Sequence, residues 1–171
     1  MRRRLLPFAL SLAVVAADQL TKCWVVATIP ENTVGYSFLG GFLRIIHVRN
    51  DAVAFSLGSS LDVPVKIVMF IVLPLLLVAF LSWLIVSQKH GGQFTRAQLW
   101  CLAGVVGGGA GNLIDRLLRS LRVVDWISVR MYGLFGMEYF PTWNIADASV
   151  VCSVLLLLIL LFFSRKRFLN E

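Results

Sequence analysis

The chain has 171 residues, of which 58% are hydrophobic, and its mean hydropathy is +0.83. This apolar share exceeds the roughly 45–50% of a soluble domain, so the composition excludes an ordinary soluble protein and favours a single membrane domain over residues 1–171. The net charge of +7 does not indicate nucleic-acid binding, because the basic residues lie at the ends of apolar runs, where they face anionic lipid headgroups.

Four apolar segments can cross a membrane, which takes about 20 residues in a helix. They cover about 5–27, 63–86, 99–114 and 145–163. Pro74 predicts a kink in the second segment, because proline removes a backbone donor from the helix. Glycine and alanine recur in the third segment at the spacing that allows close helix packing, which explains them better than phosphate binding does.

The distribution of charge predicts the orientation in the membrane. Four spans place both termini and the 87–98 loop on one side, with eight basic residues and one acidic residue, whereas the rest of the chain has eight of each. The positive-inside rule makes that side cytoplasmic and the 28–62 and 115–144 segments extracytoplasmic. The basic, apolar N-terminus also fits a cleavable secretory signal, but its removal would leave an odd number of spans.

The two extracytoplasmic segments are too apolar to be simple connections. Residues 42–48 and 122–129 are rich in β-branched side chains and partly alternate, which predicts two short strands. Residues 131–141 carry aromatic and methionine side chains with two glycines, which predicts a flap in the headgroup region. The predicted fold is an all-α membrane protein with four transmembrane helices, a small extracytoplasmic β-sheet and an interfacial flap.

Polar residues are rare in the spans and gather at their extracytoplasmic ends. A charged residue at membrane depth costs about 2.5–3.5 kcal/mol on insertion scales, so each of these residues calls for an explanation. They are Asp18 and Lys22 in the first span, Asn112, Asp115 and Arg116 after the third, Asn144 and Asp147 at the start of the fourth, and Asp125 in the second predicted strand. Because the helix ends of a compact bundle converge, we expect these side chains to meet in one pocket.

Each of these groups also has a purely structural interpretation. The interpretations are an ion pair for Asp18 and Lys22, an interfacial pair for Asp115 and Arg116, and a helix N-cap for Asn144 and Asp147.

Two carboxylates remain without a matching cation in this scheme, namely Asp125 and Asp147. Two neighbouring carboxylates in a poorly hydrated site share one proton, and the pair can then act as general base and general acid. This chemistry activates a water molecule against an amide without metal, cofactor, serine or cysteine. In this hypothesis Asn112 and Asn144 orient the pair, and Arg116 stabilises the developing negative charge.

Five stretches resemble, in order, the motifs of bacterial lipoprotein signal peptidase, the type II signal peptidase. They are DQLTK (18–22), NDAVAFS (50–56), GNLIDR (111–116), VVDWI (123–127) and FPTWNIAD (140–147). One difference is Ala52, followed by Val53, where the family usually has glycine at the third motif position. If that glycine needs a positive φ, alanine strains this loop.

The resemblance implies an aspartyl endopeptidase of the bacterial cytoplasmic (inner) membrane. It would cleave diacylglyceryl-modified prolipoproteins just before the lipidated cysteine, and globomycin-like cyclic peptides would inhibit it. The substrate backbone is expected to pass between the third and fourth spans. By motif, the catalytic residues are Asp125 and Asp147, and the supporting or substrate-binding residues are Asn112, Asp115, Arg116, Asn144, Asn50, Asp18 and Lys22.

Two other functional classes fit parts of the pattern. A small ion- or proton-coupled transporter would also carry carboxylates and amides in its spans, but its polar groups should continue into the cytoplasmic half, which here is nearly all apolar. A structural or assembly subunit would tolerate replacement of Asp125 or Asp147 by asparagine.

Overall fold

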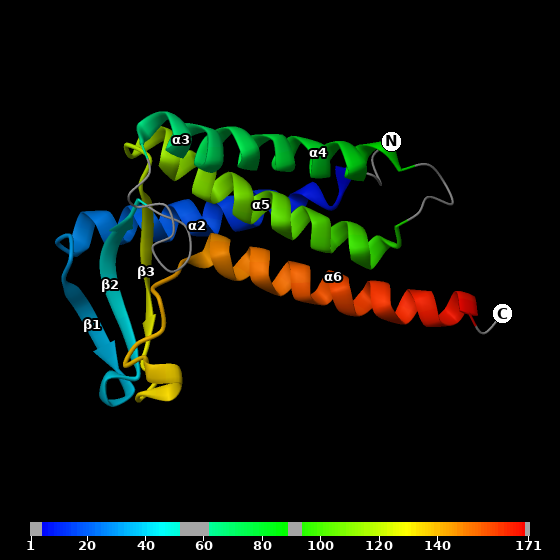
Figure 1. The fold of residues 1–171 in the computed structure, drawn as a ribbon. Coiled ribbons are helices and arrows are strands. Elements are labelled where there is room, and N and C mark those ends of the chain that lie inside the picture. The colour runs from blue at the N-terminus through cyan, green and yellow to red at the C-terminus, as the bar shows by residue number, and fades with distance from the viewer. Residues whose placement is uncertain (1–4, 52–61, 89–93, 170–171) are drawn as a thin grey trace.

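In a computed structural model, which describes residues 5–51, 62–88 and 94–169, the chain forms a helical bundle with a small sheet at one end (Figure 1). Within these ranges, four helical spans are long and apolar enough to cross a membrane. They are α2 (Phe8–Thr28), the continuous run of α3 (Val63–Ile67), η3 (Val68–Val72) and α4 (Leu73–Ser87), α5 (Arg96–Leu118), and α6 (Ile145–Leu169). The prediction of four spans is confirmed.

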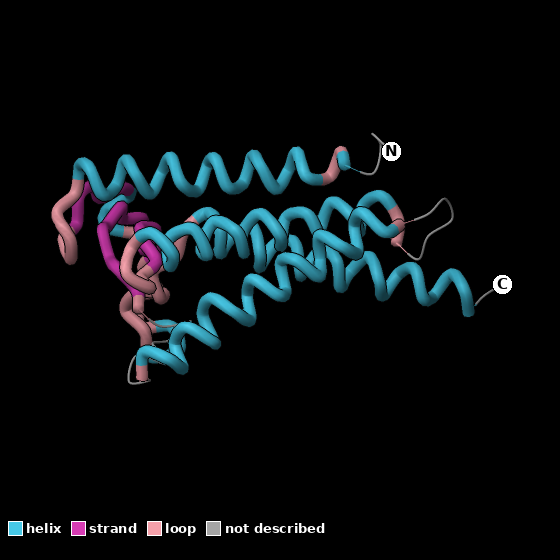
Figure 2. Tube along the Cα trace, turned by 90° about the horizontal axis from the view of Figure 1, so that it is seen from above, coloured by secondary structure: helices cyan, strands magenta, loops and turns pink. Residues whose placement is uncertain are grey.

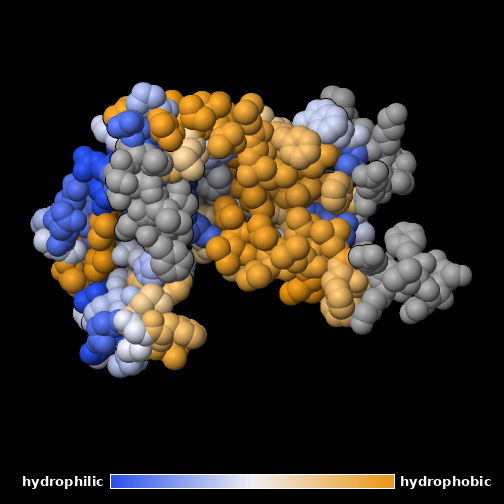
Figure 3. All heavy atoms as spheres, in the orientation of Figure 1, coloured by the Kyte–Doolittle hydropathy of each residue, from blue (hydrophilic) through white to orange (hydrophobic). Residues whose placement is uncertain are grey.

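The outer surface matches a lipid environment. Hydrophobic atoms cover the middle of the bundle on the face shown in Figure 3, and hydrophilic atoms gather over the sheet. In the most apolar stretch of each span, 6% of the residues are buried inside the protein for the second and fourth spans, whereas 56% are buried for α5. Helix α5 is therefore the central element, and the other three spans pack around it and turn their leucine-rich faces outward.

The third span is longer than the predicted 99–114. It begins after Thr95, whose hydroxyl accepts a hydrogen bond from the Gln98 backbone N–H while the Gln98 side chain accepts one from the Thr95 N–H. This reciprocal capping satisfies donors that the first helical turn leaves open. At the other end the helix continues to Leu118, so Asp115 and Arg116 lie within it.

Glycines along α5 let its backbone approach α2 and α6 closely, which agrees with the close helix packing that the sequence predicted. A Cβ atom added at Gly107 would lie 2.8 Å from Ser11 Cα of α2, and one added at Gly108 would collide with the Ala146 carbonyl oxygen of α6. Hydroxyl groups join the helices at the same places: Ser11 Oγ donates to the Ala103 carbonyl at 2.6 Å, and Ser149 Oγ to that of Gly104 at 2.9 Å. Small residues and short hydrogen bonds thus replace bulky packing in the bundle core.

Among the described residues the sheet has three antiparallel strands in the order β1 (Val34–Phe38), β2 (Leu43–Asn50) and β3 (Val123–Val129). The two predicted strands are confirmed, and β1 was not predicted. It is a fully exposed edge strand, so burial imposes no alternation of polar and apolar residues on it.

The sheet is attached to the end of α2 (Figure 2). Val25, Ile29 and Val124 form a buried apolar cluster between them. The ring of His47 in β2 donates through Nδ1 to the Ile29 carbonyl oxygen at 2.7 Å. These contacts fix β3, and with it Asp125, above the helix ends.

The predicted flap folds back on β3. Met131 N–H donates to the Glu138 carbonyl at 2.9 Å, Phe140 N–H donates to the Val129 carbonyl at 2.8 Å, and Trp143 pairs with Ile127. Phe135 at its tip is 82% exposed. From the end of the flap the chain continues within a few residues to Asn144 and the start of α6.

The glycine contacts generate a stability prediction. Gly107→Ala should lower the melting temperature, because the new Cβ meets the backbone of α2, which cannot move aside cheaply. Gly109→Ala is the matched control, because its Cβ meets only the Val78 side chain and alanine favours the helix by about 1 kcal/mol. Thermal melts in detergent should place Gly107→Ala below wild type and Gly109→Ala at or above it. The reverse order would contradict the proposed helix contact.

Candidate active site

Asp125 and Asp147 come together at the junction of β3 and α6. Asp125 is the third residue of β3 and is 3% exposed, whereas Asp147 lies in the first turn of α6. Burial, followed by the negative charge of Asp147, raises the pKa of Asp125 from 3.8 to about 7. The two carboxylates therefore interact electrostatically across the junction, as the sequence predicted.

All four carboxylate oxygens of this pair accept a hydrogen bond from a neutral amide. Asp125 accepts from Asn144 Nδ2 on Oδ1 at 2.7 Å and from Asn50 Nδ2 on Oδ2 at 3.0 Å. Asp147 accepts from Asn112 Nδ2 on Oδ1 at 2.7 Å and from the Asn144 backbone N–H on Oδ2 at 3.2 Å. Three asparagines from β2, α5 and the start of α6 thus fix the orientation of both carboxylates.

Asn144 combines the two roles that the sequence left open. Its side-chain oxygen accepts from the Asp147 backbone N–H at 2.9 Å while Asp147 accepts from the Asn144 N–H, which is a reciprocal helix cap. With its oxygen engaged in the cap, the amide must turn its NH₂ group toward Asp125. The helix cap therefore also aligns the carboxylate pair.

Lys22 is buried in the bundle and contacts three acceptors beneath this pair. Its Nζ lies 2.8 Å from Asp18 Oδ2, 3.1 Å from Asp115 Oδ2 and 2.9 Å from Asn112 Oδ1, and the three charged side chains are 0% exposed. The predicted ion pair of Asp18 and Lys22 is confirmed. Full burial does not fit direct substrate contact by Lys22.

The predicted pairing of Asp115 with Arg116 is wrong. Asp115 instead binds Lys22 and Arg119, and it accepts the Val124 backbone N–H at 2.9 Å. Adjacent residues on a helix point in directions about 100° apart, whereas residues four apart share a face. The i, i+4 spacing of Asp115 and Arg119 was the sequence signal for this pair.

Arg116 forms no ion pair with Asp115 among the described contacts. Its guanidinium carbon lies 4.7 Å from the centre of the Phe70 ring, and its charge interacts with Asp125 and Asp147 and, more weakly, with Asp115. Arg116 thus belongs to the surroundings of the carboxylate pair, as expected, although its predicted carboxylate partner was wrong.

Gln19 and Asp18 complete the buried network, and Gln19 was not predicted. Gln19 Nε2 donates to Asp18 Oδ2 at 3.1 Å, to the Gly111 carbonyl at 3.0 Å and to Asp115 Oδ1 at 3.0 Å. Asp18 also accepts the Ala146 N–H of α6 at 3.0 Å. Only the position of Gln19 beside Asp18 in the sequence pointed to it.

The second motif is described only in part. Asn50 contacts Asp125, and the next residue, Asp51, forms an ion pair with Lys66 of α3 at 3.0 Å. The remainder of that motif, including Ala52 and Val53, lies outside the described residues.

The packing of α5 on α6 argues against the expected substrate path between the third and fourth spans. At Gly104 and Gly108 the two helices are so close that an added Cβ would collide with the Ser153 side chain or with the Ala146 backbone. A peptide backbone cannot pass through this contact.

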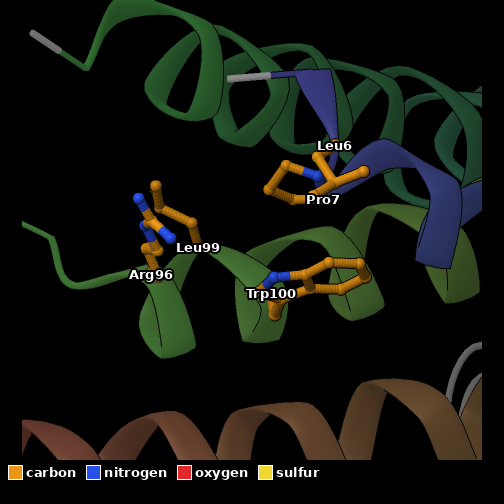
Figure 4. A pocket seen from close by; sticks show the side chains of 5 residues that line it. All are labelled: Leu6, Pro7, Arg96, Leu99 and Trp100. Atoms are coloured by element: carbon orange, nitrogen blue, oxygen red, sulfur yellow. The ribbon is translucent and has the colours of Figure 1, made fainter. Parts of the chain in front are cut away.

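A pocket at the opposite end of the bundle does not suit the same chemistry. It has a volume of about 320 Å³ and is lined by Leu6, Pro7, Arg96, Leu99 and Trp100 (Figure 4). It holds one cationic side chain and no carboxylate, so the groups at the sheet end are the better candidate site.

Comparisons with known proteins agree with the motif pattern. The family described as signal peptidase (SPase) II matches residues 10–163. The lipoprotein signal peptidase of Treponema pallidum is 41% identical over 146 residues, which are 85% of this chain and 77% of that protein. The lipoprotein signal peptidase of Borrelia garinii is 37% identical over 163 residues, which are 95% of this chain and 93% of that protein.

A solved bacterial membrane enzyme has a similar fold. Its TM-score is 0.78 at 26% identity, with 94% of this chain and 90% of that one covered. Together with the match over residues 10–163, this similarity shows that the chain belongs to the signal peptidase II family of membrane proteases.

Proposed function

We propose that the protein is an aspartyl endopeptidase whose catalytic dyad is Asp125 and Asp147. Its substrates are diacylglyceryl-modified prolipoproteins, and it cleaves them just before the lipidated cysteine. The observation that carries the proposal is the set of four neutral amide donors holding two interacting carboxylates, of which Asp125 is buried and Asp147 half-buried. The names of the relatives, lipoprotein signal peptidases, support the substrate class.

The reaction needs one ionised and one protonated carboxyl group. The ionised carboxylate takes a proton from water as the water oxygen attacks the scissile carbonyl carbon, and the protonated carboxyl group donates its proton to the carbonyl oxygen. The tetrahedral intermediate then collapses: the C–N bond breaks, the leaving amine receives a proton from one carboxyl group of the dyad, and the other carboxylate takes a hydroxyl proton from the intermediate, which restores the starting state. Because burial raises the pKa of Asp125 to about 7, this group can hold or release a proton near neutral pH.

The supporting residues fall into two groups in this proposal. Asn50, Asn112 and Asn144 orient the dyad, and Arg116 stabilises the negative charge that develops during the reaction. The second group, Asp18, Lys22 and Asp115, holds the helices and β3 in register beneath the site. Globomycin-like cyclic peptides are proposed to bind at the dyad.

Single substitutions of the dyad test the mechanism. Asp125→Asn and Asp147→Asn each keep size and most hydrogen bonds but remove proton exchange, so each should abolish turnover of a lipidated prolipoprotein in liposomes. The double variant should be no less active than either single variant, because the two groups act as one unit. A substantial fraction of wild-type turnover in either single variant would falsify the aspartyl mechanism.

Asp115→Asn serves as the contrasting variant. It leaves the buried Lys22 and Arg119 without their shared carboxylate, so it should lower the melting temperature together with activity. Each dyad variant should instead melt at or above the wild-type temperature.

The raised pKa of Asp125 predicts how stability depends on pH. Between 3.8 and about 7 the folded protein retains a proton that the unfolded chain releases, so the free energy of unfolding falls as pH rises through this window. Asp125→Asn removes this contribution. Thermal melts at pH 5 and pH 8 should therefore show a smaller loss of stability for Asp125→Asn than for wild type. Equal losses would contradict a raised pKa.

The orientation is proposed from the charge distribution. The first turn of α2 and the end of α6 lie at one end of the bundle and the sheet at the other (Figure 1), which is consistent with cytoplasmic termini, an extracytoplasmic site and residence in the bacterial inner membrane. Reporter fusions after residue 90 and at the C-terminus should report a cytoplasmic location, and fusions near residues 40 and 135 an external one. An external C-terminus would rule out this orientation.

A further inference from the structure

The second span contains a π-helical turn just before a proline. In Val68–Val72 the helix widens, and the Leu73 N–H donates to the Val68 carbonyl, five residues back. Pro74 has no N–H to donate to the carbonyl of Phe70, four residues earlier, so it weakens regular α-helical bonding at this point. Such turns are frequently found at functional sites. The kink expected at Pro74 thus takes the form of a local widening of the helix.

This turn directs one aromatic side chain into the protein. Phe70 is 2% exposed, whereas its neighbours Val68 and Met69 are 50% and 45% exposed. The Phe70 ring faces the guanidinium of Arg116, with 4.7 Å between the ring centre and the Arg116 Cζ atom. That distance lies within the range of a cation–π interaction, which strengthens when the pair is desolvated.

The charge of Arg116 interacts with both proposed dyad residues, as does that of Lys22 deeper in the bundle. An arginine side chain has several rotatable bonds, so its charge acts on the dyad only while something holds its planar head in place. The Phe70 ring supplies a flat, buried surface from the opposite span. The benefit to the reaction depends on geometry, because stabilisation of developing charge requires a group that is already oriented.

We propose that Phe70 is a positioning residue, which holds the Arg116 guanidinium toward Asp125 and Asp147 through the π-helical turn of the second span. The proposal rests on the proposed function, since it assigns Arg116 a role in the dyad reaction. Phe70 itself contacts no reacting atom in this scheme. It acts through Arg116.

The test compares two phenylalanines of the same span in the full-length protein in liposomes, with a lipidated prolipoprotein as substrate. Phe70→Leu should lower kcat about tenfold and leave KM within about twofold, because the ring holds a group that acts on the reaction rather than on binding. Phe80→Leu is the matched control, because Phe80 is 53% exposed on the outer face of α4, and it should keep wild-type kcat. Phe70→Trp retains an aromatic face and should recover most of the lost turnover.

The same substitution in an Arg116→Lys protein distinguishes positioning of the guanidinium by Phe70 from a general packing role of Phe70. In Arg116→Lys the compact ammonium cannot stack flat on the ring, so adding Phe70→Leu should lower kcat by less than about twofold further. Thermal melts show whether Phe70→Leu is folded at the assay temperature. If it is not, the milder variant Phe70→Met is compared with wild type at a lower temperature. The proposal is overturned if Phe70→Leu keeps wild-type kcat, or if its loss is the same in both backgrounds. Activity in Asp125→Asn would instead reject the proposed dyad, so the two failures are distinguishable.

Discussion

The ammonium group of Lys22 is the constraint on which the arrangement of the site depends. A fully buried lysine is tolerated only when its charge is compensated and its donors are used, because the desolvation of an isolated cation costs several kcal/mol. Lys22 meets this requirement with Asp18, Asp115 and Asn112. Each acceptor leads to a different part of the site: Asp18 accepts the Ala146 N–H at the start of α6, Asp115 accepts the Val124 N–H of β3, and Asn112 donates to Asp147. One buried cation therefore fixes α2, α5, α6 and β3 relative to one another.

The same ammonium determines which way an amide faces. The Asn112 oxygen accepts from Lys22 at 2.9 Å and from Asn144 Nδ2 at 3.3 Å, which leaves the Asn112 NH₂ group to face Asp147. A reversed amide would place NH₂ against an ammonium and oxygen against a carboxylate, and both contacts are repulsive. The orientation of the Asn112 amide toward Asp147 thus follows from the charge of Lys22, which lies deeper in the bundle.

The sequence predicted the residues of the site better than their partners. Charged and amide side chains in apolar spans are conspicuous, so Asp18, Lys22, Asn112 and Asp147 could be identified from position alone. Which residues pair depends on the direction in which each side chain leaves its helix. The predicted pairing of Asp115 with its sequence neighbour Arg116 did not consider that Arg119 lies on the same helix face as Asp115. Phe70 could not be singled out among the many apolar residues of its span, because it lies in a π-helical turn that periodicity does not reveal. Strand β1 escaped prediction for a related reason, since an exposed edge carries no burial pattern.

Four aspartates near the sheet end fall into two classes that differ in the groups they touch. Asp18 and Asp115 touch cations directly. Asp125 and Asp147 touch neutral amides, which orient a carboxylate while still permitting it to bind a proton. Arg116 lies against the Phe70 ring, and its positive charge interacts with both carboxylates of this second class.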